Sequence, residues 1–284
     1  TTLHIVLPIG ISFYTFQSMS YTIDVYRHEL KATRSVVHFF AYLSMFPQLV
    51  AGPIVRAADL LPQLEGPGQF NRQNRWTGLE RTALGFLKKC VIADNLAPIV
   101  NAGFAIDPSA SGGVHWWLMA FLFAVQIYCD FSGYSDIAIG TAQWMGYSFR
   151  DNFHHPYLAT SFREFWTRWH ISLSTWFRDY VYIPLGGSRA GALRSTANLW
   201  ITMLASGLWH GANWTFVAWG GIHGALLVLG RMTENTRRKL ATIFGLTTAP
   251  RLRHALSILT TFHLVLFAWI FFRASTIADA FTVI

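Results

Sequence analysis

The sequence predicts an all-α fold, a polytopic bundle of transmembrane helices that forms one domain over residues 1–284. Apolar residues make up 52% of the chain and charged residues only 13%, whereas soluble domains carry roughly 25% charged residues. Several apolar runs approach the ~20 residues that a helix needs to cross a bilayer. Aromatic residues, at 16%, are dense enough for interfacial belts and for packing inside a bundle.

Two apolar runs near the start are the first candidate spans, residues 3–23 and residues 36–55. Pro8 and Gly10 are expected to kink the first run, and the Gly52–Pro53 pair is expected to end the second. Basic residues lie mostly in the short loops and at the expected helix ends, which is the pattern of cytoplasmic anchoring.

The next two apolar regions are not predicted to be single, uninterrupted transmembrane helices. Residues 79–104 are interrupted by Lys88 and Lys89, so we expect a membrane entry with snorkelling lysines followed by a re-entrant part. Residues 114–145 are too long for one ordinary span. We expect one helix to about Cys129, a break, and a second membrane piece.

Asp130 and Asp136 are carboxylates inside this apolar region. They are expected to cap helices or to pair with arginines, and a role in a site is the less favoured alternative. Six residues separate them, which places them on different faces of a continuous helix. They are therefore not read as a catalytic acid–base pair.

Residues 161–214 contain the two histidines, His170 and His210, that are the main candidates for a functional site. The first part of this stretch predicts an amphipathic helix that begins at a capping box, Ser161 with Glu164, and ends at Pro184. One face is apolar, and the polar residues form a single stripe, Arg163, Thr167, His170, Ser174 and Arg178. This fits an interfacial helix whose stripe faces a wet cavity. The alternative that the stripe is only a solvated face, with His170 one member of it, stays open.

The second part places His210 between two uncharged runs, residues 195–209 and residues 214–229, and the latter contains His223. Ionisable residues at membrane depth are functional sites by default. The alternative is a buried histidine that bonds to a backbone carbonyl. Residues 231–254 follow as the most basic loop, which the positive-inside rule places in the cytoplasm, and residues 255–272 are the last candidate span.

The remaining sequence features exclude several function classes. Cys90 and Cys129 make no disulfide framework, and the adjacent His154 and His155 have no third ligand spaced to complete a metal site. The formal charge of +8 is not accompanied by a nucleic-acid-binding motif. No signal peptide is expected at Thr1, and both ends look cut, as in an internal piece of a longer membrane protein.

Five blocks of sequence resemble the membrane-bound O-acyltransferase family, and three of them resemble its bacterial alginate O-acetylation branch. The family blocks are RWHISLSTWFRDYVYIPLGG (168–187) and SGLWHGANWTFVAWGGIHG (206–224). The branch blocks are DFSGYSDIAIG (130–140), LPIGISFYTFQSMSYTIDVYR (7–27) and FPQLVAGPIVR (46–56). They occur in the expected order and cover nearly the whole chain. Members are longer on both sides, so helices outside this sequence are expected to contribute to the site.

The resemblance implies a multi-helix inner-membrane enzyme with a central funnel or tunnel. Such enzymes take an acyl group, usually acetyl, from a cytoplasmic thioester donor and pass it toward an extracytoplasmic polysaccharide or an intermediate acceptor protein. It further implies a periplasmic acetyltransferase partner, a polysaccharide assembly complex, the lipid bilayer, no nucleic acid and no cofactor or metal beyond a donor such as acetyl-CoA.

By the same resemblance, His210 is the family's catalytic histidine and His170 is the branch's second histidine. Neutral imidazole near pH 7 suits removal of a hydroxyl proton, so His210 is expected to be the general base. His170 is expected to bind the donor or to stabilise developing negative charge. Donor or substrate contacts are expected from Arg163, Arg178, Ser174, Trp209 and Asn213.

Three alternatives remain. Two keep the enzyme class but change the substrate, to D-alanyl transfer toward teichoic acid or to peptidoglycan O-acetylation. The third is a non-catalytic transporter subunit, since broken helices and polar groups inside the membrane also occur in transporters. No internal repeat supports the transporter.

Overall fold

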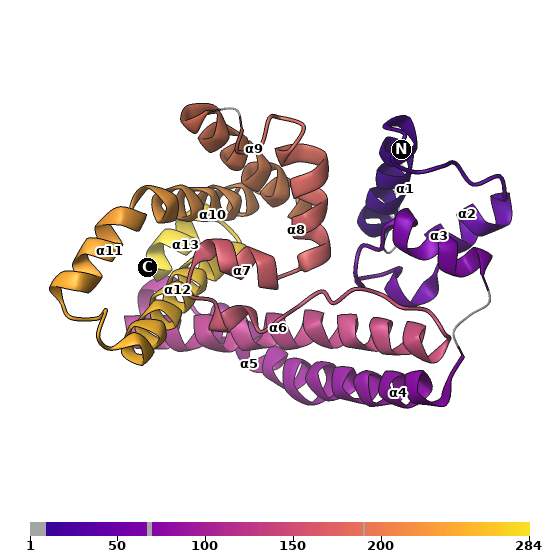
Figure 1. The fold of residues 1–284 in the computed structure, drawn as a ribbon. Helices are drawn as coiled ribbons and strands as arrows, with labels where there is room; N and C mark the ends of the chain where they lie inside the picture. Colours follow the sequence, from indigo (N-terminus) through magenta and orange to yellow (C-terminus); the bar gives the residue numbers. More distant parts are fainter. Residues whose placement is uncertain (1–9, 67–69, 190) are drawn as a thin grey trace, which may run out of the picture. The chain divides into compact units, whose positions relative to one another are not determined.

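The computed structural model describes residues 10–66, 70–189 and 191–284, and these residues form helices and loops with no β-strand. The all-α prediction is thereby confirmed (Figure 1). The α-helices of the described residues are α1 (Ile11–Tyr26), α2 (Val36–Leu43), α3 (Ala57–Glu65), α4 (Arg72–Phe86), α5 (Asp94–Phe104), α6 (Gly113–Trp144), α7 (Phe162–Arg168), α8 (Ile171–Phe177), α9 (Ala192–His210), α10 (Trp214–Met232), α11 (Glu234–Ile243), α12 (Pro250–Arg273) and α13 (Ile277–Val283).

Short 3₁₀ and π segments connect several of these helices. The 3₁₀ segments are η1 (Phe46–Gln48), η3 (Pro108–Ala110) and η4 (Pro156–Leu158), and the π segments are η2 (Leu87–Ala93) and η5 (Arg178–Tyr182). Because η2 joins α4 directly to α5, the backbone stays helical through Lys88 and Lys89. The interruption expected there is a π segment inside a continuous helical stretch.

Three helices of the described residues are long and apolar enough to cross a membrane: α6, α10 and α12. One of them, α12, confirms the expected span over residues 255–272, and α10 contains the uncharged run over residues 214–229. The expected break near Cys129 is wrong, because α6 continues without interruption from Gly113 to Trp144.

Of the two expected spans near the start, the second differs from the structure, while the first lies partly outside the described residues. The expected span over residues 36–55 is wrong, because α2 has only eight residues and the chain then turns through η1. α1 begins at Ile11, after Gly10 in a left-handed conformation, and Pro8 lies outside the described residues.

The chain forms two compact units. The first unit contains Thr1–Asp94 and Tyr128–Asn152, and the second contains Asn95–Ile127 and Phe153–Ile284. Each unit has its own packing, and the candidate histidines all belong to the second.

In the first unit, α4 and the later part of α6 pack through glycines. A Cβ atom added at Gly85 would lie 2.6 Å from the carbonyl oxygen of Gly133, and one at Gly140 would lie 2.4 Å from Oγ1 of Thr82. Contacts that short leave no room for a side chain, so the two helix backbones touch directly. Glycine at these positions permits the close approach, as small residues do between membrane helices.

Ion pairs lie along the same contact between α4 and α6, which we call the glycine seam after Gly85, Gly133 and Gly140. Asp136 accepts from Nε of Arg81 at 3.0 Å and pairs with Nζ of Lys88 at 2.6 Å, while Nζ of Lys89 lies 2.7 Å from Asp130. Arg81 also reaches Asp151. The interpretation of Asp130 and Asp136 as paired carboxylates is confirmed, and basic side chains from α4 and η2 supply the partners.

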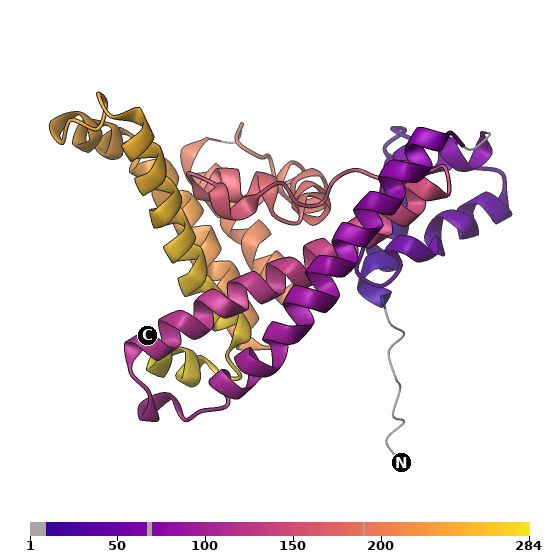
Figure 2. The same cartoon turned by 90° about the horizontal axis from the view of Figure 1, so that it is seen from below.

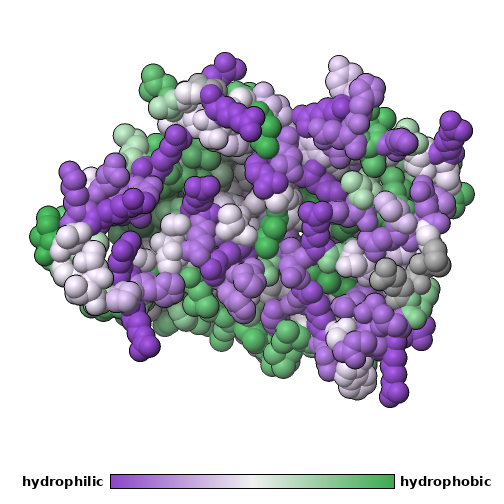
Figure 3. Space-filling model, in the orientation of Figure 1, coloured by the Kyte–Doolittle hydropathy of each residue, from purple (hydrophilic) through white to green (hydrophobic). Residues whose placement is uncertain are grey.

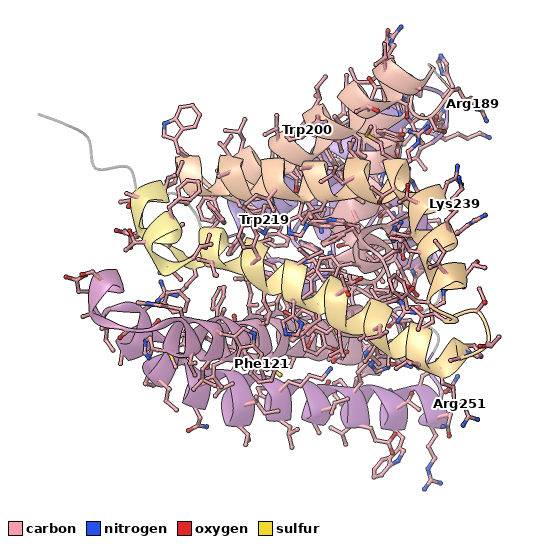
Figure 4. The ribbon with its side chains drawn as sticks, turned by 90° about the vertical axis from the view of Figure 1, so that its left-hand side faces the viewer. Phe121, Arg189, Trp200, Trp219, Lys239 and Arg251 are labelled. Carbon is pink, nitrogen blue, oxygen red and sulfur yellow. The ribbon has the colours of Figure 1, made fainter. Side chains whose placement is uncertain are left out.

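In the second unit, α9 and α10 form a close pair. A Cβ atom at Gly207 would lie 2.3 Å from the carbonyl oxygen of Phe216, and one at Gly220 would lie 2.4 Å from that of Met203. α12 packs on the other side of α10, and Figures 2 and 4 show these helices side by side. Trp219 points from α10 toward α12 (Figure 4), where its ring stacks 6.1 Å from the ring of Trp269.

Candidate functional site

The expected amphipathic helix is two short helices in the structure, α7 and α8, and the break falls at Trp169 and His170. The start was predicted correctly, because Oγ of Ser161 accepts a hydrogen bond from the backbone N–H of Glu164. The Glu164 carboxylate accepts in turn from Thr160, which completes the cap one residue earlier than a capping box requires. The prediction of one continuous helix is wrong.

His170 sits at the break with a left-handed backbone, φ 44° and ψ 55°. Non-glycine residues pay roughly 1–3 kcal/mol for such a conformation, and they concentrate at functional sites. The backbone carbonyl of His170 accepts from the N–H of Ser174, which starts α8. The turn drives the imidazole inward, so His170 is buried although its sequence neighbours on the polar stripe are not.

The expected polar stripe is therefore wrong as a single surface. Arg163 and Arg178 are exposed, and Arg178 pairs with its neighbour Asp179 at 2.7 Å. Ser174 is half-buried, and its hydroxyl donates to the carbonyl of Trp169 at 3.1 Å. The structure thus separates the two arginines from the buried His170, and their contact with a donor stays a prediction.

His170 and His210 share an aromatic neighbour, Trp209. The ring centroid of Trp209 lies 6.3 Å from that of His170 and 4.9 Å from that of His210. The structure thus brings both candidate histidines into contact with one indole ring, although 40 positions separate them in sequence. Their opening onto a common cavity stays a prediction.

His210 ends α9, where aromatic rings from α10 and α12 surround its half-buried imidazole. The rings of Trp219 and Phe272 meet it edge-on at 5.1 Å each, and Phe216 lies at 6.3 Å. Gly211 follows in an extended conformation, and a Cβ there would lie 2.7 Å from the Phe216 ring. A larger residue at that position would therefore displace an aromatic wall of the site.

His223 lies one helical turn after Trp219 on α10 and is fully buried. Its ring stacks on Phe165 at 6.0 Å and meets Trp166 and Trp219 edge-on at 5.0 and 4.8 Å. Neither ring nitrogen has a hydrogen-bond partner among the described residues. His223 therefore packs between aromatic rings of α7 and α10.

Burial keeps the two candidate histidines neutral. His170 and His210 lie outside the three helices that are long and apolar enough to cross a membrane. Burial lowers the pKa of His210 to about 4. Burial also lowers the pKa of His170 well below its usual range, and the nearby His210 adds to this effect. At neutral pH both rings therefore carry a lone pair able to accept a proton.

The last predicted contact residue, Asn213, caps a helix. Its side-chain oxygen accepts from the N–H of Thr215 at the start of α10, and its amide nitrogen donates to the carbonyl of Ser275 at 3.3 Å. Asn213 thus fixes the turn that follows His210 and ties it to the segment after α12. Its contact with a substrate stays a prediction.

A polar cavity of about 590 Å³ lies in the first unit, with none of the predicted site residues in its lining. Its charged walls are Asp59, Arg81, Arg150 and Asp151. Arg150 and Arg81 are already paired with Asp59 and Asp151. The acids and bases of this cavity therefore neutralise each other.

Sequence reasoning missed three residues whose rings contact His210: Phe216, Trp219 and Phe272. Trp219 contacts both His210 and His223, and its position four residues before His223 on one helix was a signal that could have found it. Phe272 comes from the far end of α12, and no local pattern links it to the histidine block. Only the packing of α12 against α10 brings it there.

Comparisons with known proteins agree with the five blocks. A family model described as the membrane-bound O-acyltransferase family matches residues 26–275. The protein named "Probable alginate O-acetylase AlgI" of Pseudomonas aeruginosa is 45% identical over 98% of this chain and 51% of its own length. Its namesake in Azotobacter vinelandii is 46% identical over 96% of this chain and 52% of its own length. The chain thus spans about half the length of these curated relatives.

A relative with a different name is also similar. The peptidoglycan O-acetyltransferase of Helicobacter pylori is 37% identical over 100% of this chain and 57% of its own length.

Proposed function

Since the chain belongs to the membrane-bound O-acyltransferase family, we propose that it carries the catalytic histidines of a membrane O-acetyltransferase. In this proposal the acetyl group comes from a cytoplasmic thioester such as acetyl-CoA. The acceptor is a hydroxyl of an extracytoplasmic polysaccharide or of an intermediate acceptor protein. The family is one of membrane proteins, and α6, α10 and α12 provide the apolar helices.

The single observation that carries the proposal is the neutral His210 imidazole beside the buried His170. The acceptor oxygen attacks the thioester carbonyl carbon while a ring nitrogen of His210 takes the hydroxyl proton. The carbon–sulfur bond then breaks, an ester remains, and the proton passes to the leaving thiolate. A positioned base typically contributes about 10²–10⁴ in rate. The N–H of neutral His170 is suited to donate to the developing oxyanion. No step requires a metal or cofactor.

The names of the relatives favour a polysaccharide acceptor. The relatives at 45–46% identity are named for alginate, and the one at 37% is named for peptidoglycan. We therefore place an alginate-like exopolysaccharide first, peptidoglycan second and D-alanyl transfer third. Expected partners are a periplasmic acetyltransferase and a polysaccharide assembly complex in the bacterial inner membrane, with no role for nucleic acid.

A transfer assay on the whole purified protein in proteoliposomes tests the proposal. Acetyl-CoA labelled in its acetyl group is supplied on one side, and label is measured on alginate oligomers or peptidoglycan fragments on the other. Wild type should transfer label, and His210→Ala should lower the rate by about 10²–10⁴ with an unchanged elution profile. Equal labelling of the acceptor by wild type and His210→Ala would show that His210 is not the base. No labelling of the acceptor by purified wild-type protein would favour the non-catalytic transporter subunit.

A further inference from the structure

α11 connects two helices that are able to cross a membrane. α10 ends at Met232 and α12 begins at Pro250, so the residues between them lie where both spans leave the apolar layer. In Figures 1 and 2, α11 extends away from this end of the second unit. The position of α11 is therefore the surface of the bilayer, whichever leaflet that is.

The protein covers almost none of α11. Ala241 is its single buried residue among the ten, while Ile243 and the following Phe244 are 74% and 72% exposed. Helices shorter than about 12–15 residues are only marginally stable when isolated in water. A ten-residue helix with so few protein contacts therefore needs another surface against it.

The exposed apolar residues share one face of α11. Leu240 lies three and four residues before Ile243 and Phe244, which puts the three side chains together. A well-formed end holds them there: Gly245 adopts φ 67°, and the N–H of Leu246 donates to the carbonyl of Ala241. This is a Schellman turn, the usual way to close a helix at glycine. The apolar face is thus a fixed feature of the helix.

Basic residues border this face. Arg237 and Lys239 stand at its two edges, and Arg238 lies behind, paired with Glu234. Long basic side chains beside an apolar stripe reach up to headgroups while their stems lie on hydrocarbon. Figure 3 shows hydrophilic and hydrophobic side chains mixed over α11 at the left-hand edge.

The positive charge extends beyond α11. Figure 4 shows Arg189, Lys239 and Arg251 on the same side of the second unit. Within the connection and its flanks, Glu234 is the only acid against six basic residues, Arg231, Arg237, Arg238, Lys239, Arg251 and Arg253. An apolar stripe with this charge is complementary to an anionic membrane surface, whereas an acidic soluble protein would not require Ile243 and Phe244 to be exposed.

We propose that α11 is an in-plane anchor that binds anionic phospholipid. Leu240, Ile243 and Phe244 enter the boundary between headgroups and acyl chains, and Arg237 and Lys239 contact the anionic headgroups. The inference is independent of the acyl-transfer chemistry, since no residue of α11 lies near the histidines.

Depth-dependent fluorescence quenching on the whole protein tests the anchor. An environment-sensitive probe is attached through Ile243→Cys in a background with Cys90→Ser and Cys129→Ala. The matched control carries Asn235→Cys, two turns earlier on α11 and outside the apolar face formed by Leu240, Ile243 and Phe244. Both proteins are reconstituted in vesicles of phosphatidylcholine alone or with phosphatidylglycerol. With phosphatidylglycerol, the probe at position 243 should be quenched by shallow spin-labelled lipid and protected from aqueous iodide. The probe at position 235 should stay open to iodide.

A variant without the basic side chains distinguishes binding to anionic lipid from insertion into any lipid bilayer. Arg237→Gln with Lys239→Gln should remove most of the added protection that phosphatidylglycerol gives to position 243. Equal iodide quenching at positions 243 and 235 in both vesicle types would overturn the proposal, as would equal protection with and without phosphatidylglycerol. Gel filtration of each variant checks that the fold is kept, and labelling of a second site, Phe244→Cys, repeats the test if the first variant is lost.

Discussion

The two units hold their buried ionisable groups in opposite ways. In the first unit, Asp136 lies between α4 and α6 with its side chain 13% exposed, and it is paired with Arg81 and Lys88. In the second unit, aromatic rings face His210 and His223. A charge that is matched by a counter-charge stabilises a helix contact. An imidazole kept neutral by aromatic burial remains able to take a proton, so the second environment suits chemistry.

His210→Gln gives the strongest test of this contrast. Glutamine keeps a hydrogen-bonding group of similar size but does not accept a proton near pH 7. We expect acyl transfer to fall by about 10²–10⁴, with the melting temperature unchanged. Transfer assays and thermal unfolding in the same detergent measure both. A rate within threefold of wild type would show that His210 is not the base.

Asp136→Asn should act on stability instead. Removing one partner of a buried pair typically costs about 3–5 kcal/mol, and we expect about 2–3 kcal/mol here because Arg81 and Lys88 keep some contact with solvent. Asp151→Asn is the matched control, since that carboxylate also binds Arg81 but its side chain is 60% exposed. Denaturant unfolding should show a loss of less than about 1 kcal/mol for the control. Equal losses in the two variants would contradict a special role for the seam.

The pH dependence of transfer sharpens the description of His210. The base must be unprotonated, and burial lowers the pKa of His210 to about 4. Activity should therefore hold as pH falls through 6.5, the ordinary histidine value, and decline only as pH approaches about 4. At pH 5.5 an unshifted histidine would already have lost about tenfold. Initial rates from pH 4 to 8, with the fold checked at each pH, decide between the two.

His223→Phe should have the smallest effect. The ring already stacks on Phe165, and phenylalanine removes two nitrogens that have no hydrogen-bond partner among the described residues. We expect transfer within about tenfold of wild type and equal or slightly higher stability, because an unsatisfied buried polar group costs about 1–3 kcal/mol. A loss as deep as that of His210→Gln would make His223 part of the reaction.

Length and apolar composition were sufficient to predict α12 as a span, because a span is a local property of ~20 residues. The same reasoning failed for α6, where a break was expected near Cys129. The break was expected because residues 114–145 exceed one ordinary span, but Gly133 and Gly140 pack against α4 and the helix stays continuous. That contact depends on residues about 50 positions away, which no local pattern reveals.

The sequence was sufficient to identify the two candidate histidines, but not to predict how the surrounding helices place their side chains. The two histidine blocks identified His170 and His210 by resemblance, and the uncharged runs around His210 are consistent with the lowered pKa that burial gives it. The arginine stripe failed because helical phasing assumes an unbroken helix, and the turn at His170 changes the direction of every later side chain. Whether a histidine adopts a left-handed conformation is decided by its tertiary neighbours.

The left-handed turn at His170 also determines which substitutions are informative there. Alanine would remove the imidazole and at the same time place a residue with poor left-handed propensity at φ 44°. Asparagine tolerates that region far better, so His170→Asn reports on the ring with the turn intact. Glycine tolerates it as well, and His170→Gly opens space in which added free imidazole is able to bind. Position 170 therefore needs both a residue that tolerates the left-handed backbone and an imidazole ring. Rescue of His170→Gly by added imidazole would measure the contribution of the ring alone.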